Sequence, residues 1–213
     1  MLYSIFLSAA TLLVTSTLVV PTSAQLYDRV IQTQYGPVPG FQYFDQSTLE
    51  TYFNLSTSNV AAFLGIPFAA DTGYQNRWKA PQPRELWNST FMASDFGLPC
   101  PPSARENYSE DCLSLNIWTN APTANASFPV LLWNQGSDET SNNTWWYGGG
   151  MALKDIVVIT FNRRDDAFGY LAHPDLNAEG LAGTGKNTSG NYGILDELEV
   201  AEMGTKEYRK LRR

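Results

Sequence analysis

The stretch FPVLLWNQGSDETSNNTWWYGGGMALKDIVVITFN, residues 128–162, holds two unbroken apolar runs separated by a polar, glycine-rich loop. The runs FPVLLW and DIVVITFN are rich in Val, Ile and Leu. Continuous apolar runs of this length are typical of parallel strands that are covered on both faces. The stretch therefore predicts two parallel strands of an α/β sheet, with a loop after the first strand that is a candidate for function.

The segments around this stretch predict the rest of the sheet. DRVIQTQYGPVPGFQYF (28–44) predicts two short strands about a Gly-Pro turn, and VAAFLGIPFA (60–69) predicts a buried strand. CLSLNIWT (112–119) alternates as a strand from Leu113 to Trp118. NYGILDELEVAEMG (191–204) has the start of a helix. This order predicts the N-terminal part of an α/β sheet, with antiparallel strands first and parallel strands later.

Length and charge limit the functions that the chain can have. Its 213 residues suffice for one ordinary domain or part of a larger one, and 43% of them are hydrophobic, enough for a packed core. The formal net charge of −7 argues against a nucleic-acid partner, whose phosphates require a basic surface.

The first segment, residues 1–24, has the features of a signal peptide. Its apolar centre runs from Ile5 to Val20 and is followed by a Pro turn, with small residues at Thr22 and Ala24 as the peptidase prefers. A membrane anchor is the alternative, but Ser and Thr residues dilute a stretch that falls short of the ~20 apolar residues of a span. We therefore expect cleavage, secretion and no membrane association afterwards.

Sequons and cysteines agree with secretion. The only cysteines, Cys100 and Cys112, lie close together in a Pro-rich loop, which predicts a disulfide in a secreted chain. One His and no further Cys argue against zinc, so we expect neither a metal nor a cofactor. Six N-x-[ST] sequons predict glycosylation, at Asn54, Asn88, Asn107, Asn125, Asn142 and Asn187.

The stretch GLAGTGKNTSG (180–190) is one residue short of a phosphate-binding loop. Gly180, Gly185 and Lys186 fit the spacing, but Asn187 stands where Ser or Thr would bind magnesium. No apolar strand precedes the stretch to aim its amides at a phosphate. It is therefore interpreted as a glycosylated surface loop.

The segment SEDCLSLNIW (109–118) resembles the signature of the type-B carboxylesterases, most closely that of the secreted fungal members. The resemblance runs from about residue 25 to 196. Other segments follow in the family's order: FLGIPFA, RWKAPQP, FPVLLW, DIVVITFNRR, FGYLAHPDL and SGNYGILDE.

The resemblance implies an α/β-hydrolase fold that hydrolyses a small carboxylic ester with a Ser on a G-x-S-x-G elbow, a His and an acid. The chain has no G-x-S-x-G, and its sole His, His173, lies in a His-Pro turn that resembles a structural position. The family pattern also breaks off after Asp196. We therefore expect residues 25–196 to be the N-terminal portion of that fold, truncated before the nucleophile elbow, with a divergent tail at 197–213. Without a triad, this chain is expected to be inactive.

The loop WNQGSDE (133–139) lies where the resembled family has a His-Gly-Gly-Gly-like oxyanion loop. Gly136 matches, whereas Ser137 and Asp138 stand in place of glycines. A carboxylate that pointed inward there would oppose developing negative charge. Either the loop shape varies within a subgroup, which we favour, or the oxyanion hole is altered.

The resemblance also implies two buried ion pairs, Arg77 with Glu110 and Arg164 with Asp196. Three functions stay open: a secreted carboxylic ester hydrolase, a non-catalytic secreted glycoprotein that uses the hydrolase fold to bind proteins, and an unrelated carbohydrate-binding β protein. Only the aromatic residues 145–147 suggest the last, and we expect them to pack instead.

Overall fold

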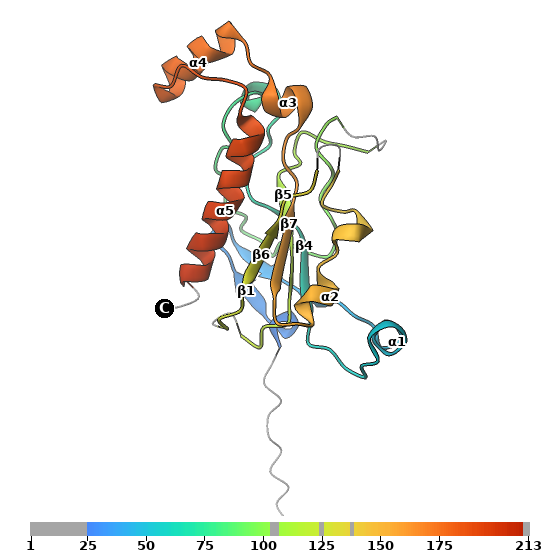
Figure 1. The fold of residues 1–213 in the computed structure, drawn as a ribbon. Coiled ribbons are helices and arrows are strands. Elements are labelled where there is room, and N and C mark those ends of the chain that lie inside the picture. The colour runs from blue at the N-terminus through green and yellow to red at the C-terminus, as the bar shows by residue number, and fades with distance from the viewer. Residues whose placement is uncertain (1–24, 103–106, 124–125, 137–138, 211–213) are drawn as a thin grey trace, which may run out of the picture.

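The computed structural model describes residues 25–102, 107–123, 126–136 and 139–210, with side chains for all of these except 184 and 204–210 (Figure 1). The strands are β1 (Val30–Gln32), β2 (Pro37–Pro39), β3 (Phe41–Gln42), β4 (Ala61–Pro67), β5 (Ser114–Thr119), β6 (Val130–Trp133) and β7 (Val157–Phe161). The α-helices are α1 (Gln46–Thr48), α2 (Gly149–Ala152), α3 (Asp166–Tyr170), α4 (Pro174–Thr184) and α5 (Tyr192–Lys210). Shorter helical turns are η1 (Leu26–Asp28), η2 (Leu49–Phe53), η3 (Tyr74–Asn76) and η4 (Thr144–Trp146).

A five-stranded mixed sheet in the order β3-β4-β5-β7-β6 forms the centre of the molecule. β4, β5 and β7 pair antiparallel with one another in turn, and β6 runs parallel to β7. The prediction of antiparallel strands followed by parallel ones is therefore confirmed. The predicted N-terminal hairpin is β1–β2, which pairs Ile31 with Val38 outside the main sheet.

Side chains alternate between two apolar layers, one on each face of the sheet. Ala61 and Phe63 of β4 face the layer that includes Val200 of α5, and Ala62 faces the layer that includes Ala152 of α2. Figure 1 shows α5 along one side of the sheet and α2 on the other. Successive side chains of a β-strand point to opposite faces of the sheet, so residues two apart share a layer.

The alternation shifts once, at Gly65 in β4. The pairing with β5 slips between Phe63 and Ile66, and Gly65 has a φ of +67°. A Cβ at Gly65 would lie 2.3 Å from the backbone oxygen of Asp95, so only glycine fits the bulge without a shift. The Gly65 amide donates instead to the Asn116 side chain at 2.8 Å.

Two expectations need correction. The apolar run of β6 predicted cover on both faces, but β6 is an edge strand whose Val130 is 49% exposed. The expected surface loop at 180–190 begins as helix, because α4 continues to Thr184 and ends at Gly185 with a φ of +73°. The expected start of a divergent tail at residue 197 stays a prediction, and α5 runs across that position.

The proposed signal peptide, residues 1–24, lies outside the described residues. Among the residues that the structure describes, none of the helices has the length and apolar character needed to cross a membrane.

Candidate functional site

The loop that follows β6 begins with a buried glutamine. The Gln135 side chain donates from Nε2 to the backbone oxygen of Phe161 at 2.6 Å, and its backbone oxygen accepts from Arg163 at 3.2 Å. The loop therefore starts bound to the carboxyl end of β7, the neighbouring parallel strand. Because parallel strands end at the same edge of a sheet, this edge is where α/β folds place their sites.

A buried polar network fixes the middle of the same loop. Asn116 of β5 donates from Nδ2 to the Ser141 hydroxyl at 3.1 Å and to the Thr160 hydroxyl at 3.0 Å. The Ser141 amide donates to the side-chain Oδ1 of Asn162 at 3.0 Å. Asn116, Ser141 and Thr160 are at most 1% exposed. Bonds in such a dry interior strengthen one another, so the sheet holds the loop at Ser141 in one position.

Gly136, the matching residue of the expected oxyanion loop, borders open space. A Cβ placed on it would have no heavy atom within 4 Å. Its backbone oxygen accepts from the amide of Glu139 at 3.3 Å. Ser137 and Asp138 lie outside the described residues.

Arg163 joins this loop to α5. Its guanidinium donates to Asn134 Oδ1 at 3.1 Å and pairs with Asp165 and, at 3.1 Å, with Glu197 of α5. Asn134 also donates to Glu197 at 2.9 Å. The arginine side chain is only 9% exposed, and its partners satisfy its charge. The cluster thus fixes the ends of β6 and β7 to the first turns of α5.

The expected partners Arg164 and Asp196 meet in the interior. Arg164 donates from Nε at 2.9 Å and from Nη2 at 2.7 Å, and its amide donates to the same carboxylate at 3.1 Å. The two side chains are 3% and 0% exposed. Burial raises the pKa of Asp196 above its usual value, although the bonds and charge of Arg164 oppose this shift. Arg164 therefore favours the ionised form of this carboxylate, against the effect of burial.

Arg77 and Glu110 also meet, at 2.7 Å from Nε to Oε2, with a second bond from Nη2 to Oε1. This pair was expected to be buried. The Arg77 and Glu110 side chains are instead 40% and 24% exposed. The guanidinium carbon of Arg77 lies 5.8 Å from the ring centre of Trp78 and 5.9 Å from that of Phe168.

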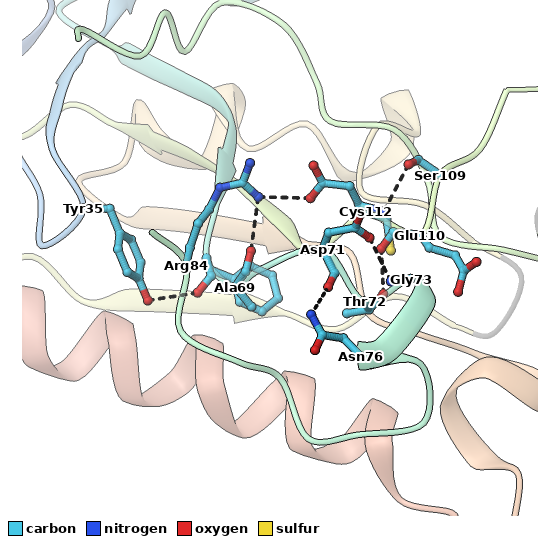
Figure 2. Close-up of polar contacts among 12 residues, drawn as sticks. Tyr35, Ala69, Asp71, Thr72, Gly73, Asn76, Arg84, Ser109, Glu110 and Cys112 are labelled. Carbon is cyan, nitrogen blue, oxygen red and sulfur yellow. Dashed lines mark hydrogen bonds and ion pairs between the residues drawn. The ribbon is translucent and has the colours of Figure 1, made fainter. Parts of the chain in front are cut away.

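Neighbouring contacts hold the rest of the segment 109–112 (Figure 2). The Thr72 hydroxyl donates to the Glu110 backbone oxygen at 2.6 Å, and Arg84 donates to Asp111 at 3.0 Å. Cys112 is joined to Cys100 by the disulfide. Asn162 donates to the Cys112 backbone oxygen at 3.3 Å, so the disulfide loop and the loop after β6 share one anchor.

Comparison with known proteins identifies the family of this chain. The carboxylesterase family profile matches residues 27–200 of the chain. The chain belongs to the carboxylesterase family. The match starts two residues later and ends four residues later than the range 25–196 expected from the sequence.

Relatives of known activity and structure agree with the family. Fumonisin B1 esterase of Sphingopyxis macrogoltabida is 35% identical over 191 residues, which cover 84% of this chain and 32% of that protein. Acetylcholinesterase of Electrophorus electricus is 32% identical, covering 66% and 24%. The EstA structure of Aspergillus niger superposes with a TM-score of 0.65 at 26% identity, covering 84% of this chain and 32% of EstA. The carboxylesterase chain thus spans about a third or less of these relatives, and its fold is a part of the α/β-hydrolase fold.

The single histidine of the carboxylesterase chain has a structural position. His173 caps α4, and its Nδ1 accepts from the Asp175 amide at 3.2 Å. Ser189 lies nearby, but its hydroxyl bonds the Asn177 side chain and the His173 backbone, not the imidazole. These three residues therefore do not form a Ser-His-acid relay.

Most of the sequon asparagines lie at the surface, and the tryptophans that follow the loop after β6 differ in exposure. Asn54, Asn88, Asn107 and Asn187 are exposed, Asn142 is half-buried and Asn125 lies outside the described residues. Trp146 packs on Trp133 with ring centres 5.2 Å apart, while Trp145 is 81% exposed. The family match excludes the unrelated β protein considered for this aromatic cluster.

Sequence reasoning missed the network around Asn116, the Arg163 cluster and the pair of Arg84 with Asp111. The network around Asn116 could have been found from the sequence, because Asn116 is a polar residue inside an apolar strand and a buried polar group needs partners. Among the described residues there is no group of three or more His, Cys, Asp or Glu side chains that could hold a metal.

Proposed function

We propose that this chain is the N-terminal portion of a secreted carboxylic ester hydrolase. The observation that carries the proposal is the loop after β6, held at the carboxyl edge of the parallel pair by Asn116, Ser141 and Asn162. A loop fixed before substrate arrives is what stabilisation of an oxyanion requires, because the donors then need no rearrangement during the reaction. We place the substrate carbonyl beside Gly136, where an added Cβ would have no heavy atom within 4 Å.

The substrate of the complete hydrolase is a small carboxylic ester. The names of two relatives, a fumonisin B1 esterase and an acetylcholinesterase, support an ester substrate, and its small size is part of the proposal. The Aspergillus niger relative among the solved structures supports a protein of the fungal type.

By itself, this chain does not hydrolyse esters. Acyl transfer needs a nucleophile, a base and oxyanion donors within hydrogen-bond reach of one carbonyl. The sequence has no G-x-S-x-G, and its only imidazole is used as the cap of α4. Ser137 and Asp138 further change the loop from the family pattern, and we favour a change of loop shape as their effect.

The secreted form carries glycans and begins at Gln25. The four exposed sequon asparagines and the disulfide between Cys100 and Cys112 support passage through an oxidising secretory route. N-terminal sequencing and glycopeptide mapping of the secreted product test this part. An intact Met1 or unmodified asparagines at every sequon would contradict it.

A protein-binding glycoprotein is the second candidate. The observation that favours it is Trp145, which is 81% exposed on the same loop, because exposed aromatic side chains are frequent anchors of protein interfaces. A neuroligin-like protein of Caenorhabditis elegans, 28% identical over 178 residues, is among the relatives.

The test is hydrolysis of 4-nitrophenyl acetate by the secreted chain, beside its Gly136→Ala and Gly183→Ala variants. Neither added methyl group meets a neighbour, so both variants should fold. We expect only slow, non-saturating hydrolysis that is equal in all three proteins. Saturable turnover that Gly136→Ala reduces and Gly183→Ala does not would show that this chain is itself an esterase.

A further inference from the structure

An exposed apolar patch lies where η2 meets α2. Tyr52 is 77% exposed, and Phe53 and Leu55 are 38% and 41% exposed. Met151 of α2 is 50% exposed, and a Cβ added to its neighbour Gly150 would lie 3.7 Å from the Phe53 ring. Figure 1 shows α1, which leads into η2, at the edge of the molecule on the side of α2. We call the four exposed side chains, at 52, 53, 55 and 151, the η2 patch.

The η2 patch is held in place by the core. Leu49, at the start of η2, is 1% exposed, and the Phe53 ring packs edge-on against the Phe44 ring with centres 5.2 Å apart. Leu49 and Phe44 belong to the apolar layer that includes Ala152. The amide of Leu55 donates to the Leu49 backbone oxygen at 3.2 Å. A partner of this patch therefore meets a surface that needs little ordering.

The area of the η2 patch limits what can cover it. Four side chains of this size and exposure present on the order of 400 Å². Each partner of a standard protein interface buries about 800 Å², so the patch is too small to hold a second copy or another folded protein by itself. A group attached to the chain needs less area, because its tether raises its effective concentration at the patch.

An attachment point lies inside the η2 patch. Asn54 is exposed and belongs to the sequon formed with Leu55 and Ser56. It ends η2 with a φ of +53°, a left-handed conformation that asparagine adopts more readily than most residues. Two residues of the patch precede Asn54 in the chain and one follows it, so a glycan on its side chain begins within the patch.

We propose that the N-glycan of Asn54 packs its first sugar rings on the η2 patch and covers it. A pyranose ring has a face of C–H groups that suits the negative face of an aromatic ring, while its hydroxyl groups stay in water. The glycan thereby removes an apolar patch from the surface that other molecules could contact. This inference rests on the proposed secretion and glycosylation of the chain, and it assigns one of the glycans a structural role.

Another sequon provides a matched control. Asn187 is exposed, and the three residues on either side of it are Thr, Gly, Lys, Thr, Ser and Gly. No large apolar side chain flanks Asn187 as Tyr52 and Phe53 flank Asn54. A glycan on Asn187 therefore has no adjacent apolar surface to cover.

Nitration of tyrosines by tetranitromethane, mapped by mass after removal of the glycans, tests the proposal on the chain secreted from a glycosylating host. The test variant is Ser56→Ala, which removes the sequon but leaves Asn54 in its left-handed conformation, and the control is Asn187→Gln. We expect Tyr52 to react on the order of threefold faster in Ser56→Ala than in the parent or the control, because the ring changes from mostly covered to mostly exposed. Tyr74 of η3, which is 85% exposed, is the internal standard and should react equally in all three proteins.

Glycopeptide mapping separates this proposal from the glycosylation on which it rests. Equal Tyr52 rates in the parent and in Ser56→Ala, with Asn54 glycosylated in the parent, would overturn the packing. An unmodified Asn54 beside glycans at other sequons would overturn it too, but would leave the secreted glycoprotein in place. The absence of glycans from every sequon would contradict both.

Removal of the glycans from the folded parent with a peptide N-glycosidase repeats the comparison without a substitution. It should accelerate Tyr52 to the same extent as Ser56→Ala and leave Tyr74 unchanged. An acceleration of both tyrosines would show a general effect of the glycans and would overturn the assignment to Asn54.

Discussion

Replacing Asp196 by alanine should strongly lower the stability of this fold. Arg164 is 3% exposed and loses three hydrogen bonds to the carboxylate, at 2.7, 2.9 and 3.1 Å, while keeping only the bond from Nη1 to the Lys79 backbone oxygen. Removing one partner of a buried pair leaves an uncompensated charge and costs about 3–5 kcal/mol. Because whole domains are stable by only about 5–15 kcal/mol, a loss of this size is a substantial share of the total.

The assay is urea denaturation followed by tryptophan fluorescence. Asp196→Ala should lower the free energy of unfolding by about 3–5 kcal/mol. The control is Asp111→Ala, whose partner Arg84 forms a pair with side chains 28% and 47% exposed and should contribute at most about 1 kcal/mol. A loss below about 1 kcal/mol for Asp196→Ala, equal to that of the control, would show that Arg164 does not need this partner in the folded state.

The reverse change, Arg164→Met, adds a dependence on pH. Without the arginine, only burial acts strongly on Asp196, so its pKa in the folded state rises further above the value near 3.9 of an unfolded chain. The folded state then binds a proton that the unfolded state releases, and stability falls as pH rises above about 4. Arg164→Met should therefore lose more stability at pH 7 than at pH 4 relative to the parent, and adding Asp196→Asn should remove this difference.

Three further predictions concern other parts of the fold. Replacing both cysteines with serine should lower stability by roughly 3 kcal/mol, measured by the same denaturation, and mass mapping of the parent should find no free thiol. Gly65→Ala should cost at least about 1–2 kcal/mol because of its positive φ and the nearby backbone oxygen, whereas Gly183→Ala, in open space within α4, should be stabilising by up to about 1 kcal/mol. Hydrogen bonds from Ser47 and then Thr48 hold the pKa of Asp45 at about 2, so NMR should show its cap on α1 intact above the unfolded pKa near 3.9 and lost as pH falls through 2.

Strands were predictable where local pattern decides them. The alternating run around Leu115 forms β5, and the continuous apolar run around Val158 forms β7. Both strands place apolar side chains in the two layers that cover the sheet. Exposure of Val130 was not predictable, since it depends on whether another strand lies beside β6 and not on the residues of β6. Helix α4 was missed because its polar, glycine-containing sequence has no apolar stripe to signal it.

The contacts that hold the candidate site were less predictable from the sequence than the strands. The sequence pointed to the loop at Gly136 but not to what holds it, because Asn116 and Ser141 are 25 residues apart and their contact is set by the order of strands. The cluster of Arg163 was missed for the same reason: its partners Asn134 and Glu197 lie on two other elements. Long-range polar contacts carry no spacing rule that one sequence can display.

The central claim is that this chain holds the carboxylesterase loop without an activated serine. The most direct measurement is the intact mass of the secreted chain after exposure to a fluorophosphonate, which reacts with serines that a neighbouring base has activated. We predict an unmodified protein, because His173 is the cap of α4 and Ser189 is not hydrogen-bonded to its ring. Stoichiometric phosphonylation of one serine in the folded chain, lost on denaturation, would contradict it.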